Sequence, residues 1–139
     1  IKIPRQQSVV EYEDYTGDDK AWRWRYHMAE LLASRIDSER FGVKGFYLFG
    51  STSTGKAGPG SDIDIIIHFD GNENQRKNLE NWLEGWSMSL AEINYMNTGY
   101  RMEKMLDVHI ITDEDIKNRD SFAIKINHPV DPAIPLKTS

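Results

Sequence analysis

Cysteine is absent from this 139-residue chain. Its absence excludes disulfide bonds, thiolate zinc sites and cysteine nucleophiles, and it fits a reducing compartment. Long apolar runs are also lacking, since no stretch approaches the roughly 20 residues that a membrane-spanning helix needs. The first residues do not resemble a signal peptide. We therefore expect a cytoplasmic protein that has no contact with a membrane.

An excess of basic residues is missing too, because the net charge is -5. Tight generic binding to a phosphate backbone is therefore not indicated, although Lys20, Arg23 and Arg25 form a local basic cluster. The hydrophobic share of 39% and the charged share of 28% are those of an ordinary globular domain. A chain of this length predicts one domain with its own core.

The organisation along the chain has three parts. Residues 1–17 are rich in polar types and are expected to be irregular, and residues 18–120 are expected to form the folded domain. Residues 121–139 carry three closely spaced prolines, which disfavour a helix and a central strand. We expect a tail or linker there. Because the chain starts at Ile1 rather than Met, we interpret it as part of a larger chain, with a trimmed whole protein as the alternative.

Hydrophobic periodicity predicts alternating helices and strands. A helix capped by Asp18 or Asp19 is followed by strands at 46–49 and 62–69, with a small-residue loop over 50–61 between them. A second helix ends near Gly99, a third strand covers 105–112, and Asp113 caps a short helix over 114–119. This order predicts an α/β (or α+β) domain with helices packed on a small sheet. Trp82 and Trp86 lie at helical spacing, which favours a core role over base stacking.

The segment from Gly50 to Lys56 matches the first part of a P-loop. The match then fails, because Ala57 replaces the hydroxyl residue that binds magnesium. Gly58 and Pro59 follow where a helix should begin, and the loop leads directly into a strand. We reject a P-loop.

Acidic side chains share one face of two predicted strands. Because residues two apart point the same way in a strand, Asp62 lies beside Asp64, and Asp107 lies beside His109. Adjacent carboxylates repel each other unless a cation lies between them, and magnesium prefers oxygen ligands. Upstream, Gly50 allows backbone amides to approach a phosphate, and the Ser51 hydroxyl can donate to it. If the two strands are neighbours, three carboxylates converge on a pair of metal ions.

Gly50-Ser51, then ten residues ending in Ser61, then Asp62-x-Asp64 on an apolar strand resembles the signature of the DNA polymerase beta-like nucleotidyltransferase superfamily. The likeness is greatest to its minimal members, and it covers residues 46–69 with Asp107 as the third carboxylate. It implies a small mixed sheet flanked by helices, an NTP donor and two Mg²⁺ ions.

The resemblance also implies residue roles. Gly50 and Ser51, with Ser61, would hold the donor triphosphate, and Asp62 and Asp64 would bind metal. Asp107 would ligate the catalytic metal and help to deprotonate the acceptor. For Lys56, binding of donor phosphates and simple solvation of a loop tip remain open. His68 and His109 either line the cleft or are ordinary half-buried histidines.

Larger members of the superfamily carry a further helical domain that this chain lacks. Similar domains are appended to relatives of pyruvate phosphate dikinase and phosphoenolpyruvate synthase, and minimal members often pair with a helical protein. We expect metal-dependent transfer of a nucleoside monophosphate from NTP to the hydroxyl of a protein or small molecule, rather than to nucleic acid. The alternative is a non-catalytic nucleotide-sensing or partner-binding module, antitoxin-like or regulatory. A third hypothesis, a purely structural domain, predicts no NTP binding.

Overall fold

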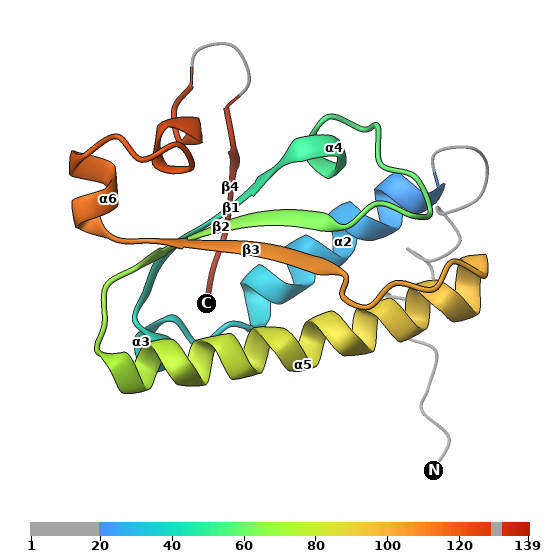
Figure 1. The fold of residues 1–139 in the computed structure, drawn as a ribbon, viewed down its shortest axis with the longest axis horizontal. Coiled ribbons are helices and arrows are strands. Elements are labelled where there is room, and N and C mark those ends of the chain that lie inside the picture. Colours follow the sequence, from blue (N-terminus) through green and yellow to red (C-terminus); the bar gives the residue numbers. More distant parts are fainter. Residues whose placement is uncertain (1–19, 129–131) are drawn as a thin grey trace.

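The computed structural model describes residues 20–128 and 132–139 (Figure 1). The irregular segment expected at 1–17 and the helix cap expected at Asp18 or Asp19 lie outside these residues. In chain order the elements are α2 (Lys20–Arg35), α3 (Ser38–Phe41), β1 (Val43–Phe49), α4 (Gly50–Ser53), β2 (Ile63–Phe69), α5 (Glu73–Thr98), β3 (Leu106–Ile111), α6 (Asp113–Lys117), the 3-10 helix η1 (Ala123–Lys125) and β4 (Ile134–Leu136).

The sheet is mixed, and its strand order is β3-β2-β1-β4. β1 pairs antiparallel with both β2 and β4, whereas β2 pairs parallel with β3. A parallel pair needs a long crossover, and α5 supplies it between β2 and β3. The small mixed sheet flanked by helices confirms the fold class expected from the sequence.

Strand alternation gives the sheet two different faces. Ile63, Ile65 and Ile67 of β2 are fully buried in the main core with apolar residues of α2 and α5. In Figure 1 these two helices lie along one side of the sheet. Asp64, Ile66 and His68 point to the other face, where they are available for chemistry or for a second, smaller core.

Part of the expected C-terminal tail belongs to the folded domain. Ala123 and Ala133 are buried with Ile66 of β2 and Ile111 of β3 in a second apolar cluster. Ile134–Leu136 forms β4, which pairs with β1. The expectation of a tail or linker is wrong for these residues, because an edge strand tolerates a proline such as Pro135. The small alanines also fit closely over the second face of the sheet.

Two local expectations also need correction. The cap of α6 is Thr112 rather than Asp113: its hydroxyl accepts from the Asp115 N–H at 3.3 Å, and the Asp115 carboxylate accepts from the Thr112 N–H at 2.9 Å. This reciprocal pair satisfies two N–H groups at once, which a cap at Asp113 would not do. The loop after β1 also begins with a helical turn, α4. Among the described helices, none is long and apolar enough to cross a membrane.

Candidate functional site

Three carboxylates converge on the second face of the sheet. Asp62, Asp64 and Asp107 are each half-buried, and each offers an oxygen that lies within 4.8 Å of the other two. Asp64 and Asp107 are direct partners in the parallel register of β2 and β3, and Asp62 immediately precedes β2. The prediction that the three acids share one sheet face is therefore confirmed.

The crowding of charge at this cluster changes the protonation of Asp64. Burial, followed by repulsion from Asp62 and Asp107, raises the pKa of Asp64 to about 7. A hydrogen bond between the protonated Asp64 carboxyl and Asp107 contributes to this raised pKa, while the positive charge of Lys125 acts in the opposite direction. Without another cation, the cluster therefore holds a proton up to near-neutral pH.

Gly50 joins β1 to the carboxylate cluster in a way that no other residue allows. Its φ of 73° lies in the left-handed region, which glycine adopts without strain. A Cβ at this position would also clash with Oδ2 of Asp64. The backbone of the Gly50-Ser51 turn thus lies directly against a carboxylate of the cluster.

The other residues predicted to bind nucleotide lie around the same loop. Ser51 is half-buried in α4, whose four residues leave their N–H groups without partners inside the helix. The Ser61 hydroxyl accepts from the Gly58 N–H at 3.0 Å, so this residue also shapes the loop. Lys56 is exposed near the turn between α4 and Ala57. Gly50, Ser51 and Ser61 therefore border the carboxylate cluster, whereas the side chain of Lys56 extends into solvent.

Two residues of α2 fix both ends of the loop over 50–61. Trp22 donates from Nε1 to the carbonyl of Thr52 at 2.5 Å. Arg25 is fully buried, and its guanidinium donates to the carbonyl oxygens of Ser61 (2.8 Å) and Pro59 (3.0 Å). A third bond runs from Arg25 to Oδ1 of Asn94 in α5, at 2.8 Å. The sequence places Arg25 in a local basic cluster, whereas in the structure Arg25 is buried and holds the residues just before Asp62 in place.

Burial of Arg25 costs desolvation of its charge, and its removal would leave hydrogen-bond acceptors without a donor. Desolvation lowers its pKa to about 10, with partial compensation from the charge of Asp62, so it stays protonated at neutral pH. Arg25→Met should lower the free energy of unfolding by about 3 kcal/mol, because Asn94 and two loop carbonyls lose their donor. Urea denaturation measures this loss, with Arg35→Met, an exposed arginine of the same helix, as the control. Equal stability of the two variants would show that Arg25 does not hold the loop.

The two histidines differ in their relation to the cluster. His109 lies two residues along β3 from Asp107, on the same face, with Nε2 at 3.4 Å from Oδ2 of Asp107. Its ring stacks on Phe122 with centroids 3.7 Å apart and planes at 14°. His68 instead contacts Asp113 at 2.6 Å, at the opposite end of β2 from Asp64. Thus His109 lines the candidate site and His68 does not.

Lys125 is a site residue that sequence analysis missed. It lies in η1, within the segment expected to be a tail, and its Nζ is 5.3 Å from the ring centroid of Phe49. Phe49 is the register partner of Asp64, and Lys125 acts electrostatically on that carboxyl. In the sequence, only the apolar residues of 121–139 indicate that this segment packs on the rest of the domain, and so that Lys125 could lie near the cluster.

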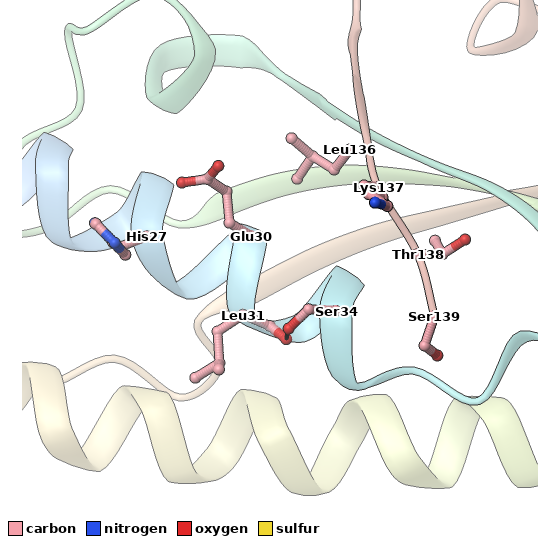
Figure 2. A pocket seen from close by; sticks show the side chains of 8 residues that line it. All are labelled: His27, Glu30, Leu31, Ser34, Leu136, Lys137, Thr138 and Ser139. Atoms are coloured by element: carbon pink, nitrogen blue, oxygen red, sulfur yellow. Dashed lines mark hydrogen bonds between the residues drawn. The ribbon is translucent and has the colours of Figure 1, made fainter. Parts of the chain in front are cut away.

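The hollow between α2 and the end of the chain is separate from this site (Figure 2). It has a volume of about 580 Å³, and its lining includes His27, Glu30 and Leu31 of α2 and Leu136 of β4. Leu136 packs against the main core, on the helix-covered face of the sheet. The carboxylate cluster lies on the other face, so the hollow has no part in its chemistry.

A mixed sheet with a Gly-Ser turn and three convergent carboxylates defines the polymerase beta-like nucleotidyltransferase class, in agreement with the resemblance of the motif. The family profile described as "Nucleotidyltransferase domain" matches residues 32–130. This match covers well over half of the chain, and the chain belongs to the nucleotidyltransferase domain family.

Comparison with other proteins adds little to this assignment. No protein of curated function matches the chain. Among solved structures, the chain is similar to a Sulfolobus solfataricus protein whose own description as a nucleotidyltransferase is provisional. The two share 18% identity over 85% of each chain, with a TM-score of 0.33. A likeness at this level carries no argument about substrate or activity.

Proposed function

We propose that this domain transfers a nucleoside monophosphate from an NTP to an acceptor hydroxyl in a reaction that depends on divalent metal. One observation supports the proposal: Asp62, Asp64 and Asp107 converge beside the Gly50-Ser51 turn, where a metal-ligand set would lie next to backbone N–H groups that suit a phosphate. A purely structural domain gains nothing from this arrangement, because clustered carboxylates repel each other.

The donor set of the cluster fits Mg²⁺. Three carboxylates each supply a hard oxygen ligand, and these oxygens lie within 4.8 Å of one another. The raised pKa of Asp64 supports this fit, since the cluster is short of positive charge. Two bound Mg²⁺ ions would supply charge stabilisation at the attacking and leaving oxygens.

The chain's own residues have distinct roles in the proposed reaction. Asp62, Asp64 and Asp107 would hold the metal, and the N–H groups of the turn at Gly50 and the Ser51 hydroxyl would bind the triphosphate. The acceptor oxygen forms a bond to the α-phosphorus, the bond from that phosphorus to the bridging oxygen of pyrophosphate breaks, and pyrophosphate leaves. Asp107 orients the acceptor and takes its proton. Ser61 shapes the loop and contacts donor phosphates, and Lys56 binds the same phosphates from the loop tip.

For the acceptor we propose the hydroxyl of a protein or a small molecule. The net charge of -5 disfavours a polyanionic acceptor such as nucleic acid. The cluster itself is acidic, so an acceptor without phosphates meets less repulsion near Asp107.

Nucleotide binding is tested by titrating the protein with each NTP in the presence of Mg²⁺ while its amide chemical shifts are monitored. We expect saturable shifts centred on Gly50 and Ser51, and incubation with α-labelled NTP and candidate acceptors should give a labelled product with release of pyrophosphate. Binding without transfer to any acceptor would favour the non-catalytic nucleotide-sensing module. The absence of any response to NTP would contradict the proposal and favour a purely structural domain.

Lys125→Met should weaken nucleotide binding without weakening metal binding. The ammonium group offsets the carboxylate charge, so its loss should leave Mn²⁺ binding equal or tighter. We place the Lys125 ammonium, which acts on the Asp64 carboxyl, next to the bound phosphates, so its loss should weaken binding of the metal-NTP complex by about tenfold. Calorimetric titrations of both ligands measure this split, with the exposed Lys117→Met of α6 as control. A parallel change in both affinities would show that Lys125 does not contact the nucleotide.

A further inference from the structure

β3 forms an open edge of the sheet. Within residues 20–128 and 132–139, β3 has a strand partner, β2, on one side only. Figure 1 shows β3 at the margin of the sheet, beside α5. Such an edge presents backbone N–H and C=O groups that can pair with another chain.

The two edges of this sheet differ in how they are protected. β4 at the opposite edge has three residues, with Pro135 in the middle. A short strand with a proline resists further pairing. β3 has the six residues Leu-Asp-Val-His-Ile-Ile, with neither proline nor lysine, and its register with β2 is regular throughout. The edge formed by β3 is therefore longer and more regular than the edge formed by β4, and its one acidic side chain, Asp107, belongs to the carboxylate cluster.

The outward backbone groups of β3 follow from its pairing. Ile63 donates to the carbonyl of Met105 at 2.7 Å, so the backbone of Met105 faces β2. Since backbone groups alternate in direction along a strand, those of Leu106, Val108 and Ile110 face the open edge. The Leu106 N–H already donates to the Ser87 hydroxyl at 3.0 Å. Within the part of the chain that the structure describes, Val108 and Ile110 are left as the donors and acceptors for an added strand.

A groove runs beside this edge, between β3 and α5. Its volume is about 540 Å³, and its floor is formed by Leu83, Leu106, Val108 and Ile110. Val108 and Ile110 are only half-buried, and Met88 at the groove is 59% exposed. The groove therefore offers apolar surface directly next to unpaired backbone groups.

The rim of the groove is acidic. Glu80, Glu84 and Glu103 are exposed along it, and Lys104 is its one basic lining residue in the described chain. Glu80 and Glu84 lie one turn apart on α5, so they present their charges to the same side. The rim is complementary to lysine or arginine, whose aliphatic stems can pack on the apolar floor.

We propose that the outer edge of β3 and this groove bind an extended segment of a partner protein, which adds to the sheet as a strand next to β3. The segment pairs with the backbone of Val108 and Ile110 and places aliphatic and basic side chains in the groove. A second copy of this chain is a poorer occupant, because it would bring the same acidic rim and the same acidic β3 rather than basic side chains.

Amide hydrogen exchange tests the open edge with a defined probe. The probe is a short capped peptide of repeated Lys-Lys-Val-Val, which presents both lysine and valine on each face of a strand, and its match has glutamate in place of every lysine. In the free protein, the amides of Val108 and Ile110 should exchange much faster than those of Ile65 and Ile67 in β2. The lysine peptide should slow exchange at both edge positions. Its affinity should fall as the salt concentration rises, and this affinity should exceed that of the glutamate peptide by at least about tenfold.

Two variants separate the contributions of backbone and charge. Val108→Pro removes an edge N–H without removing a bond to β2, and it should abolish protection by the lysine peptide. Glu80→Lys with Glu84→Lys keeps the edge and should reverse the preference between the peptides. Three results would overturn the proposal. They are edge amides already protected from exchange in the free protein, protection from exchange that depends on protein concentration, and equal or absent binding of the two peptides. The first result would mean that the chain covers its own edge, and the second that a second copy covers it.

Discussion

Asp64→Asn is expected to abolish nucleotide transfer while leaving the metal-free domain at least as stable as the original protein. The substitution keeps the shape of the side chain but removes a charge from the metal-ligand set. Because correctly held metal ions supply several kcal/mol to such a reaction, the rate should fall by about three orders of magnitude. Product formation from α-labelled NTP, at saturating Mg²⁺, measures this loss.

The stability of the same variant has a defined dependence on pH. The pKa of Asp64 is raised in the folded protein to about 7, so the unfolded chain releases this proton first as the pH rises from about 4. The metal-free protein therefore loses stability between about pH 4 and pH 7, and Asp64→Asn lacks this part of the loss. Since the carboxylate is half-buried and partly screened by solvent, the gain at pH 8 should be on the order of 1 kcal/mol.

Thermal melts at pH 5 and pH 8, in the presence of a chelator, separate the two effects. Asp70→Asn serves as the control, because Asp70 is an exposed acid after the other end of β2. Unfolding of the Asp64→Asn domain would mean that the carboxylate is structural. Full transfer activity in a folded variant would place the chemistry elsewhere.

Among glycine-to-alanine substitutions in the loop over 50–61, Gly50→Ala is expected to distort the site most. The backbone conformation of Gly50 is unfavourable for alanine, and the added Cβ would meet Oδ2 of Asp64. The backbone strain should cost about 1–3 kcal/mol of stability. Displacement of Asp64 should weaken Mn²⁺ binding by at least about tenfold, as is typical when the support of a ligand is lost.

A glycine in the same loop provides the matched control. A Cβ at Gly58 would meet nothing within 4 Å, so Gly58→Ala should change neither stability nor metal affinity appreciably. Denaturant unfolding and Mn²⁺ titration of the two variants measure the contrast. If Gly50→Ala bound Mn²⁺ as tightly as Gly58→Ala, the turn at Gly50 would not support the carboxylate cluster.

Strand alternation made much of the site predictable from the sequence. In β2, buried isoleucines alternate with Asp64 and His68, so the face of each acid followed from its position. The same rule placed Asp107 and His109 together on β3. Local patterns of this kind depend only on neighbouring residues, and they are therefore visible without tertiary structure.

The roles of Arg25 and Lys125 were not predictable in the same way. Arg25 is buried because the loop carbonyls and Asn94, distant in sequence, surround it. Lys125 lies near the site because Ala123 and Ala133 pack on Ile66 and Ile111. The prolines of this segment indicated a linker, whereas its burial depends on contacts with strands far away in the chain. Such contacts leave no local periodicity.

The central claim is that the three carboxylates form a divalent-metal site, and paramagnetic broadening of amide signals by Mn²⁺ tests it most directly. The account predicts saturable broadening centred on Gly50, Asp64 and Asp107, with about tenfold weaker binding at pH 6 than at pH 8, because Mn²⁺ must displace the proton that Asp64 holds up to about pH 7. Asp64→Asn should bind Mn²⁺ at least about tenfold more weakly at pH 8 and should lose most of this pH dependence. Broadening spread evenly over the acidic surface, or equal Mn²⁺ binding by the original protein and Asp64→Asn, would contradict the account.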